Sequence, residues 1–396
     1  MAISSLSSAC AHDASGASTI DLIGRASVAG DARDKSGLSA KLEDGTPGDT
    51  LGGFGSAIAW TGVVDRYVTA VDRGPKDGAT SFANRLQWFD VVLDLKAAAG
   101  LSVSLVATTM LVDESGRALT ARVEAYDEKA QEKGLRFDAE GVRVSPTGTL
   151  FVSDEYGPWI VEFSREGRML RRLPVPEHYR VKQPGPSKED AIAGNDAGRV
   201  TNRGFEGLAL SSDGKALFAL VQHPLIQDGG RKGRHARLLE VPIDGGPTRE
   251  YVVTLDDEQL KFNEIVAIGA NKFLVIERDD EAGAKAKTKR IVAVDITDAS
   301  DVSSVESLPK KALPDGLKPA KKQILFDLLD PRFGLAGAGF PEKIEGLCFG
   351  PDLPDGRRSL VVTSDNDFEL LEPSHVWVFA VPSAALGETE SRPSAK

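Results

Sequence analysis

One short pattern recurs four times along this chain of 396 residues: a glutamate stands directly before an apolar strand pattern. The copies read E-G-V-R-V from Glu140, E-G-L-A-L from Glu206, E-I-V-A-I from Glu264 and E-G-L-C-F from Glu345. A turn and further strand patterns follow each copy, and an earlier unit has the same order with Ser56 in place of the glutamate. Regular self-similarity of this kind is the signature of a repeat architecture.

The strand count of the five units predicts how the chain closes. Four units supply four strand patterns each, but the last unit stops at its third strand, which ends at Val381. The segment from Thr19 to Val28 is a strand pattern that belongs to no unit. The unassigned first strand can supply the missing fourth strand of the last unit. We therefore predict an all-β fold, a single β-propeller of five four-stranded blades closed by the N-terminal strand.

Two other architectures fit less well. A sixth, degenerate blade remains an alternative, although no strand patterns are available for it. A two-sheet sandwich does not explain the repeat and the closure together. The 40 glycines and 21 prolines, spread along the chain, favour many short strands joined by tight turns over a helical bundle.

The expected domain boundaries leave two short tails. The propeller is assigned to residues 18–382, residues 383–396 are expected to be a disordered C-terminal tail, and residues 1–17 are either a leader remnant or a disordered tail. Small residues precede Cys10 in M-A-I-S-S-L-S-S-A-C, as in a lipoprotein or export signal. We expect an exported protein, periplasmic or secreted, with lipidation at Cys10 as an open alternative. No apolar run is long enough for a transmembrane helix.

The propeller geometry gives the four glutamates a common position. The first strand of each blade lines the central channel, so Glu140, Glu206, Glu264 and Glu345 are expected to converge at one mouth of it. Carboxylates brought together in a partly desolvated site must take up protons or bind a cation. Calcium accepts 6 to 8 oxygen ligands in flexible geometry, which suits ligands from separate strands. Alternatively, the carboxylates cap backbone N–H groups and tie the blades together.

The turns after the second strands add oxygen ligands and cations on the same rim. Asp154 and Asp365 stand in two of these turns, and the predicted Ca²⁺ ligands are Glu140, Glu206, Glu264, Glu345, Asp154 and Asp365. The same region carries Arg73, Arg203 and Arg278, which either neutralise the acidic ring or bind the anionic part of a substrate, because the guanidinium matches phosphate and carboxylate geometry. The candidate catalytic residues are Glu206 and Glu140 with these three arginines.

The net charge limits the range of partners. A net charge of -11 argues against nucleic acid, which proteins hold with clustered lysines and arginines. We expect a monomer that acts on a small anionic substrate, a phosphate ester or another ester.

Three segments carry a family resemblance. D-A-E-G-V-R-V-S-P-T-G-T-L-F-V-S-D-E-Y-G, N-R-G-F-E-G-L-A-L-S-S-D-G-K-A-L-F-A-L, and K-I-E-G-L-C-F-G-P-D-L with T-S-D-N-D-F resemble the phytase-like family, which is also described by an esterase-like activity of phytase. The resemblance runs from about Thr19 to Val381. It implies an exported bacterial propeller associated with hydrolysis of phosphate esters or other esters. It carries over no catalytic assignment residue by residue.

The leading functional hypothesis is metal-assisted ester hydrolysis, in which calcium polarises a phosphoryl or acyl oxygen while water attacks. One alternative is a lactonase with a central calcium ion. Another is a glycoside hydrolase with paired carboxylates, although aromatic residues make up only 6% of the chain and no sugar-stacking cluster flanks the glutamates. The last is a non-catalytic, ligand-binding propeller with a structural metal.

Overall fold

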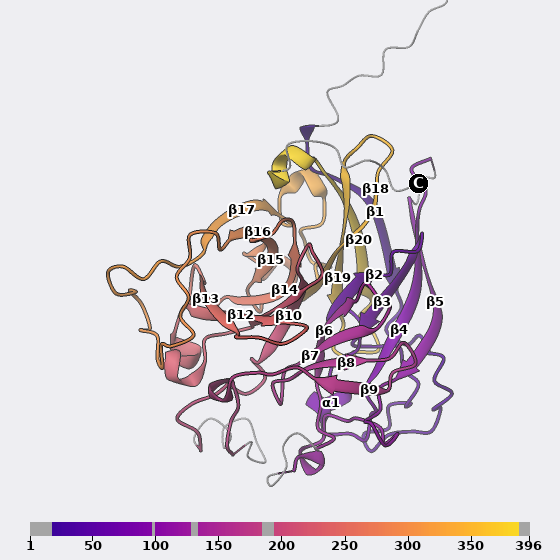
Figure 1. Cartoon of the computed structure of the whole chain (residues 1–396). Coiled ribbons are helices and arrows are strands. Elements are labelled where there is room, and N and C mark those ends of the chain that lie inside the picture. The colour runs from indigo at the N-terminus through magenta and orange to yellow at the C-terminus, as the bar shows by residue number, and fades with distance from the viewer. Residues whose placement is uncertain (1–17, 97–99, 128–133, 184–193, 388–396) are drawn as a thin grey trace, which may run out of the picture.

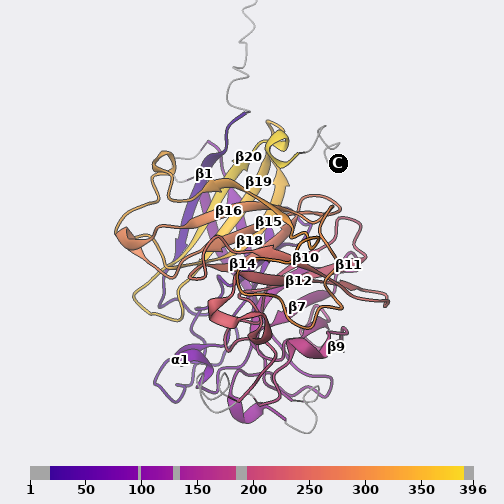
Figure 2. The same cartoon turned by 90° about the vertical axis from the view of Figure 1, so that its left-hand side faces the viewer.

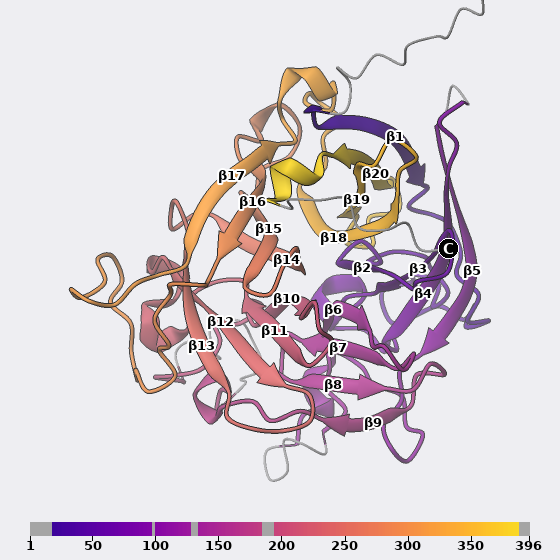
Figure 3. The ribbon, with the colours of Figure 1, turned by 45° about the horizontal axis from the view of Figure 1, so that its top comes forward.

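The fold is a five-bladed β-propeller (Figure 1). The computed structural model describes residues 18–96, 100–127, 134–183 and 194–387. These residues form five four-stranded antiparallel sheets arranged around a central axis, as Figure 3 shows. The all-β propeller predicted from the repeat is confirmed, and the described residues form no sixth sheet.

The blades follow one another along the chain. The first blade contains β2 (Ala57–Trp60), β3 (Arg66–Ala70), β4 (Arg85–Leu93) and β5 (Leu101–Met110). The second contains β6 (Ala139–Val144), β7 (Leu150–Asp154), β8 (Ile160–Phe163) and β9 (Met169–Arg172). The third contains β10 (Phe205–Leu210), β11 (Ala216–Val221), β12 (His235–Pro242) and β13 (Arg249–Thr254). The fourth contains β14 (Lys261–Ala267), β15 (Lys272–Arg278), β16 (Lys289–Asp295) and β17 (Lys321–Asp327).

The last blade is completed by the first strand of the chain, as predicted. It contains β18 (Lys343–Asp352), β19 (Arg358–Asp365), β20 (Ser374–Val381) and β1 (Asp21–Val28). β1 pairs antiparallel with β20 from Asp21 opposite Ala380 to Val28 opposite Ser374, and the two strands lie side by side in Figure 2. This pairing satisfies the edge of β20 and ties the two ends of the propeller together.

Helices are short; all but the last lie in connections between strands, and the last follows β20. They are α1 (Pro75–Gly78), η2 (Val123–Ala125), η4 (Glu177–Tyr179), η5 (Ile226–Asp228), η6 (Gly230–Lys232), η7 (Gly283–Lys285), η8 (Pro331–Phe333) and η9 (Ser383–Leu386). No helix in the described ranges has the length and apolar character needed to cross a lipid bilayer.

The chain remains ordered slightly beyond the boundary expected at residue 382. Residues 383–386 form η9, because Leu386 is buried and joins the apolar cluster that contains Ile291 and Phe379. Residues 1–17, including Cys10, and residues 388–396 lie outside the described ranges. The predictions made for them therefore remain predictions.

The core fills the spaces between neighbouring blades. β11 reads A-L-F-A-L-V and is apolar throughout, because both faces of its sheet pack against another blade. Phe218 on β11 and Phe273 on β15 are in contact across one such space, with ring centroids 4.7 Å apart. The inner strands β2, β6, β10, β14 and β18 contact one another in turn around the axis. Their N-terminal ends therefore meet at one mouth of the channel.

Candidate functional site

A polar pocket occupies the mouth of the channel where the inner strands begin. Its volume is about 220 Å³, and all five blades contribute to its lining. Nine carboxylates and five cationic side chains face it, together with two amides. The lining residues are Asp72, Arg73, Asp77, Glu140, Glu155, Asn202, Arg203, Glu206, Gln222, Lys261, Arg278, Asp280, Glu342, Lys343, Glu345 and Asp367.

A β-bulge directs three of the repeated glutamates into this pocket. The pairing of inner and second strands slips by one residue at Glu140, at Glu206 and at Glu345. The bulged residue is left out of the ladder, which allows its side chain to turn away from the sheet.

The glycine after the glutamate allows the inner strands to approach closely. A Cβ atom on Gly207 would lie 2.4 Å from the backbone oxygen of Asn263, and one on Gly346 would lie 3.0 Å from that of Gly55. Both contacts join neighbouring blades, so a side chain at either glycine would push the inner strands apart. The E-G pair is therefore a packing requirement as well as a source of carboxylates.

Glu264 differs from the other three glutamates because it lies below the pocket. In β14 the bulge spans Asn263 and Glu264, and it is Asn263 that reaches the pocket residues, donating hydrogen bonds to Glu206 and, at 3.4 Å, to Glu345. Glu264 accepts a hydrogen bond from the backbone N–H of Leu208 at 3.0 Å and pairs with Arg143.

Two carboxylate clusters lie on one side of the site. The Glu140 cluster comprises Asp138, Glu140 and Glu155, and the Asp365 cluster comprises Asp72, Asp365 and Asp367; within each, one oxygen per residue lies within 4.8 Å of the others. Both carboxylate oxygens of Asp138 and of Asp365 are buried without a hydrogen-bond partner among the described residues. Such oxygens suit a hard cation with oxygen ligands.

Arg73 links the two clusters. Its Nη1 atom lies 3.6 Å from Glu140 Oε1, 3.7 Å from Asp138 Oδ2 and 3.8 Å from Asp72 Oδ2. Lys343 forms an ion pair with the Asp365 cluster, with Nζ 2.7 Å from Asp367 Oδ1. These two cations offset part of the negative charge, as expected for buried carboxylates.

Burial and mutual repulsion perturb the acidic groups. Burial raises the pKa of Glu140 and of Glu206 well above the ordinary range, and repulsion from neighbouring carboxylates raises both further. Burial also raises the pKa of Asp72 to about 7. For Glu345 burial acts in the same direction, but Lys343 and Arg278 outweigh it and lower the pKa. The pocket thus holds carboxyl groups in opposite protonation regimes.

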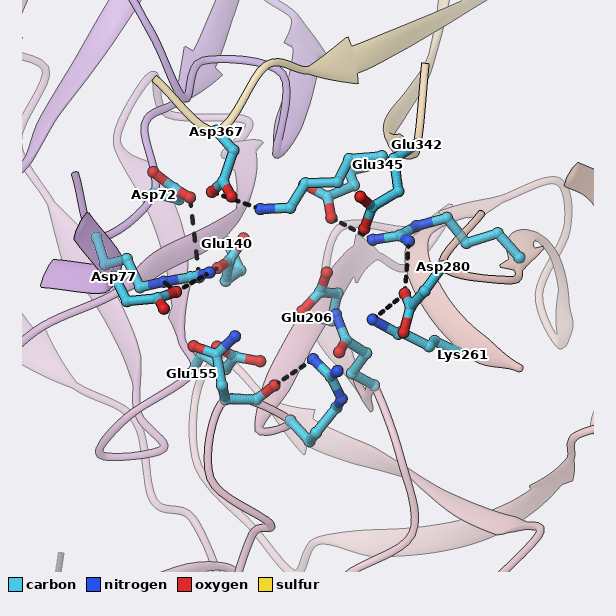
Figure 4. A pocket seen from close by; sticks show the side chains of 16 residues that line it. Asp72, Asp77, Glu140, Glu155, Glu206, Lys261, Asp280, Glu342, Glu345 and Asp367 are labelled. Carbon is cyan, nitrogen blue, oxygen red and sulfur yellow. Dashed lines mark hydrogen bonds and ion pairs between the residues drawn. The ribbon is translucent and has the colours of Figure 1, made fainter. Parts of the chain in front are cut away.

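The opposite side of the pocket is cationic. Arg203, Lys261 and Arg278 come from the third and fourth blades, and Figure 4 shows Lys261 and Asp280 across the pocket from Glu140 and Glu155. Burial, with the nearby charges of Arg278 and Arg203, lowers the pKa of Lys261 to about 7.

The two arginines on this side have different partners. Arg278 pairs with Glu345 at 2.5 Å and with Asp280 at 3.1 Å. Arg203 donates to the backbone oxygen of Asn202 and forms no ion pair with another described residue. Among the described residues, Arg203 is therefore the cation on this side without a carboxylate in ion-pair contact.

Most of the site residues predicted from the sequence are brought together. Glu140, Glu206, Glu345, Arg73, Arg203 and Arg278 line the pocket. Asp365 lies in the cluster next to Asp72 without lining the pocket. Asp154 lies behind the lining, where its carboxylate accepts hydrogen bonds at 2.7 to 3.0 Å from the backbone N–H groups of Asp138, before β6, and of Tyr156 and Gly157, in the turn after β7.

Sequence reasoning missed several charged residues of the site, and a simple signal would have found three of them. Asp138 and Lys343 stand two residues before Glu140 and Glu345, and Lys261 stands two residues before Asn263. Strand residues two apart face the same side, so position i−2 before each pocket residue points toward the same mouth.

The fold and this site define the class of the protein: a five-bladed propeller with a charged pocket on its axis. Residues 49–368 match the family described as phytase-like, esterase-like activity of phytase, so the chain belongs to the phytase-like family. That description supports a hydrolase-type propeller.

The chain is also similar to individual proteins. It is 31% identical over 314 residues to an uncharacterized secreted protein of Arthroderma benhamiae, and the match spans 61% of each chain. Two solved structures resemble it at 11% identity and a TM-score of 0.33: a luciferin-regenerating enzyme, with 82% of this chain and 76% of that chain covered, and the PQQ-bound aldose sugar dehydrogenase of Streptomyces coelicolor, with 82% and 78% covered.

Proposed function

We propose that the protein is a calcium-dependent hydrolase of phosphate esters or related esters, and that the reaction takes place in the axial pocket. The observation that carries this proposal is the division of one pocket into a carboxylate side and a cationic side. The carboxylate side has a buried carboxylate, Asp138, without a hydrogen-bond partner among the described residues, and the cationic side has an arginine, Arg203, without an ion-pair partner there.

The Glu140 cluster has the donor set for the cation. Asp138, Glu140 and Glu155 offer only oxygen ligands, and Asn202 and Gln222 add amide oxygens in the same pocket. Calcium tolerates such mixed ligands from separate strands. When bound there, calcium would supply the charge that polarises the phosphoryl or acyl oxygen of an ester.

The cationic side orients the substrate in this proposal. Arg203 and Arg278 bind the anionic group, because their guanidinium groups match its oxygens, and they offset charge that develops in the transition state. Lys261 shares this role when it is protonated. Arg73 stays with the carboxylates and limits their repulsion.

Glu206 is the candidate for proton transfer. Its Oε1 accepts a hydrogen bond from Asn263, whereas its Oε2 is buried without a partner in the described structure. Burial and the neighbouring carboxylates raise its pKa well above the ordinary range, so it takes up a proton more readily than a free carboxylate does. We propose that it takes the proton of the attacking water or gives one to the leaving oxygen.

The first test is activity with and without calcium. Wild-type protein should hydrolyse an aryl phosphate or an aryl ester in calcium and lose that activity in chelator, while lactones and aryl glycosides serve as the competing substrates. If chelator changes neither the melting temperature nor the turnover, the calcium mechanism fails. Turnover of a lactone or a glycoside alone would reassign the reaction.

The second test separates catalysis from structure. Glu206→Gln should lower kcat about 100-fold or more while the protein stays folded, as expected for loss of a general acid or base. Glu166→Gln is the matched control, because Glu166 is exposed in the turn before β9. A Glu206→Gln protein with unchanged turnover would show that Glu206 is not the proton-transfer group, whereas absence of turnover in the wild type on every substrate would favour a binding propeller with a structural metal.

Export is part of the proposal, because the relative from Arthroderma benhamiae is a secreted protein. Fractionation of cells that express the full chain would find it outside the cytoplasm, and Cys10→Ser would release it from membranes only if that cysteine carries a lipid. Retention of the full chain in the cytoplasm would contradict the proposal.

A further inference from the structure

A second cavity lies at the other end of the propeller, at the seam where the ring closes. Its volume is about 510 Å³, and it is lined by strands of the first and last blades. β18 connects the two sites: Lys343 and Glu345 at its start line the charged pocket, whereas Asp352 at its end lines this cavity. The two sites therefore open at opposite ends of the inner strands.

The walls of this cavity are mainly apolar. Val91, Leu93, Leu101 and Val378 line it, and Val64 at its edge is 71% exposed. Its volume lies within the range of about 300 to 1,000 Å³ that is typical of sites for small molecules, which combine apolar walls with a few polar groups.

One polar group in the lining lacks a hydrogen-bond partner in the described part of the chain. Tyr67 lines the cavity and is 3% exposed, yet its hydroxyl forms no hydrogen bond with another described residue. The hydroxyl lies beside Gly350, where a Cβ atom would be 2.2 Å from it. Buried tyrosine hydroxyls usually find a hydrogen-bond partner. Burial also raises the pKa of Tyr67, so the hydroxyl keeps its proton and can donate.

Charges at the rim narrow the class of ligand. Asp65, Asp94 and Asp352 contribute carboxylates and Lys96 contributes one cation. Asp352 pairs with Arg358 at 2.8 Å. The remaining carboxylates outnumber the lysine, so the rim disfavours an anionic ligand, unlike the cationic side of the axial pocket.

We propose that this cavity binds a small neutral amphiphile, whose apolar part contacts the valine and leucine walls and whose carbonyl oxygen accepts a hydrogen bond from Tyr67. The site is separate from the axial pocket and does not depend on the hydrolase activity proposed there.

The test uses Nile red, a neutral apolar dye with a carbonyl oxygen, titrated into the full-length protein and followed by fluorescence. Saturable one-site binding is expected. Tyr67→Phe should weaken it about 5-fold, the effect of losing one hydrogen bond of about 1 kcal/mol. Val64→Asp should weaken it at least as much, since it places a charge on the apolar edge without disturbing a buried residue.

Leu371→Asp is the matched control, because Leu371 is 95% exposed and lies outside the cavity lining. It should bind the dye as the wild type does. The proposal is overturned if uptake of the dye does not saturate. It is also overturned if Val64→Asp binds the dye as tightly as the wild type and the Leu371→Asp control do. Calcium and inorganic phosphate should not compete with the dye, and competition would place it in the axial pocket instead.

Discussion

Arg143 and Glu264 form a buried ion pair across the central channel, with 3.0 Å between Nη2 and Oε1. Arg143 stands on β6, three residues beyond Glu140, and also donates to the backbone oxygens of Ile58, Ile265 and Leu347. These oxygens belong to the inner strands of three other blades. The pair therefore joins four blades beneath the charged pocket.

Replacing Arg143 by methionine should lower the free energy of unfolding by about 3 to 5 kcal/mol, because Glu264 would keep a buried charge without its cation. Chemical denaturation measures the change. Arg231→Met, at an exposed position in η6, should stay within about 0.5 kcal/mol of wild type. If both variants unfold alike, the ion pair does not join the blades.

Gly207→Ala tests the packing role of the E-G pair. The new methyl group would meet the backbone oxygen of Asn263, so we expect a loss of about 1 to 3 kcal/mol or more. Gly269→Ala is the control, since a Cβ there would lie 3.7 Å from its nearest neighbour, which is an ordinary contact. Equal melting temperatures for the two variants would contradict close approach of β10 and β14.

The stability of the metal-free protein should fall as pH rises from about 5 to 7. Burial raises the pKa of Asp72 and of Glu264 to about 7 and that of Asp154 to about 6. In this window each of these carboxyl groups binds more protons in the folded state than in the unfolded chain, so they stabilise the fold at low pH and lose that contribution as pH rises. His223, whose pKa burial lowers to about 4, acts in the opposite direction and offsets part of the effect.

Denaturation in chelator over this pH range measures the effect. Asp72→Asn should reduce the slope, because it removes one of the titrating groups. Calcium should also reduce the slope if it replaces the protons on the carboxyl groups around Arg73, such as Asp72. A stability that increases steadily from pH 5 to 7 in chelator would refute the raised pKa values.

Arg203 and Arg278 should behave differently when each is changed to glutamine. Arg203→Gln should raise KM for an anionic ester about 10-fold or more with little effect on folding, because no carboxylate in the described structure depends on it. Arg278→Gln should also destabilise the fold by about 3 to 5 kcal/mol, since Glu345 would lose its partner at 2.5 Å.

Steady-state kinetics and melting curves together distinguish the two arginines. If Arg203→Gln leaves KM unchanged, the cationic side does not bind the anionic group of the substrate. If Arg278→Gln is as stable as wild type, the ion pair with Glu345 contributes little to the fold.

The amino-acid sequence by itself determined the architecture. Five copies of the strand pattern, and a first strand without a unit of its own, are local properties that can be counted along the chain. Closure by pairing β1 with β20 followed from that count. The convergence of Glu140, Glu206 and Glu345 followed as well, because each copy places its glutamate at the same end of an inner strand.

Only the tertiary structure decided what each repeat position does. Glu264 has the same place in the pattern as Glu206, yet the bulge in β14 turns Asn263 toward the pocket and leaves Glu264 to pair with Arg143. Which residue faces the pocket depends on how the bulge packs against the neighbouring blade, and the charge state of each carboxyl group depends on partners from other blades. Those contacts join residues far apart in the chain, so no local pattern encodes them.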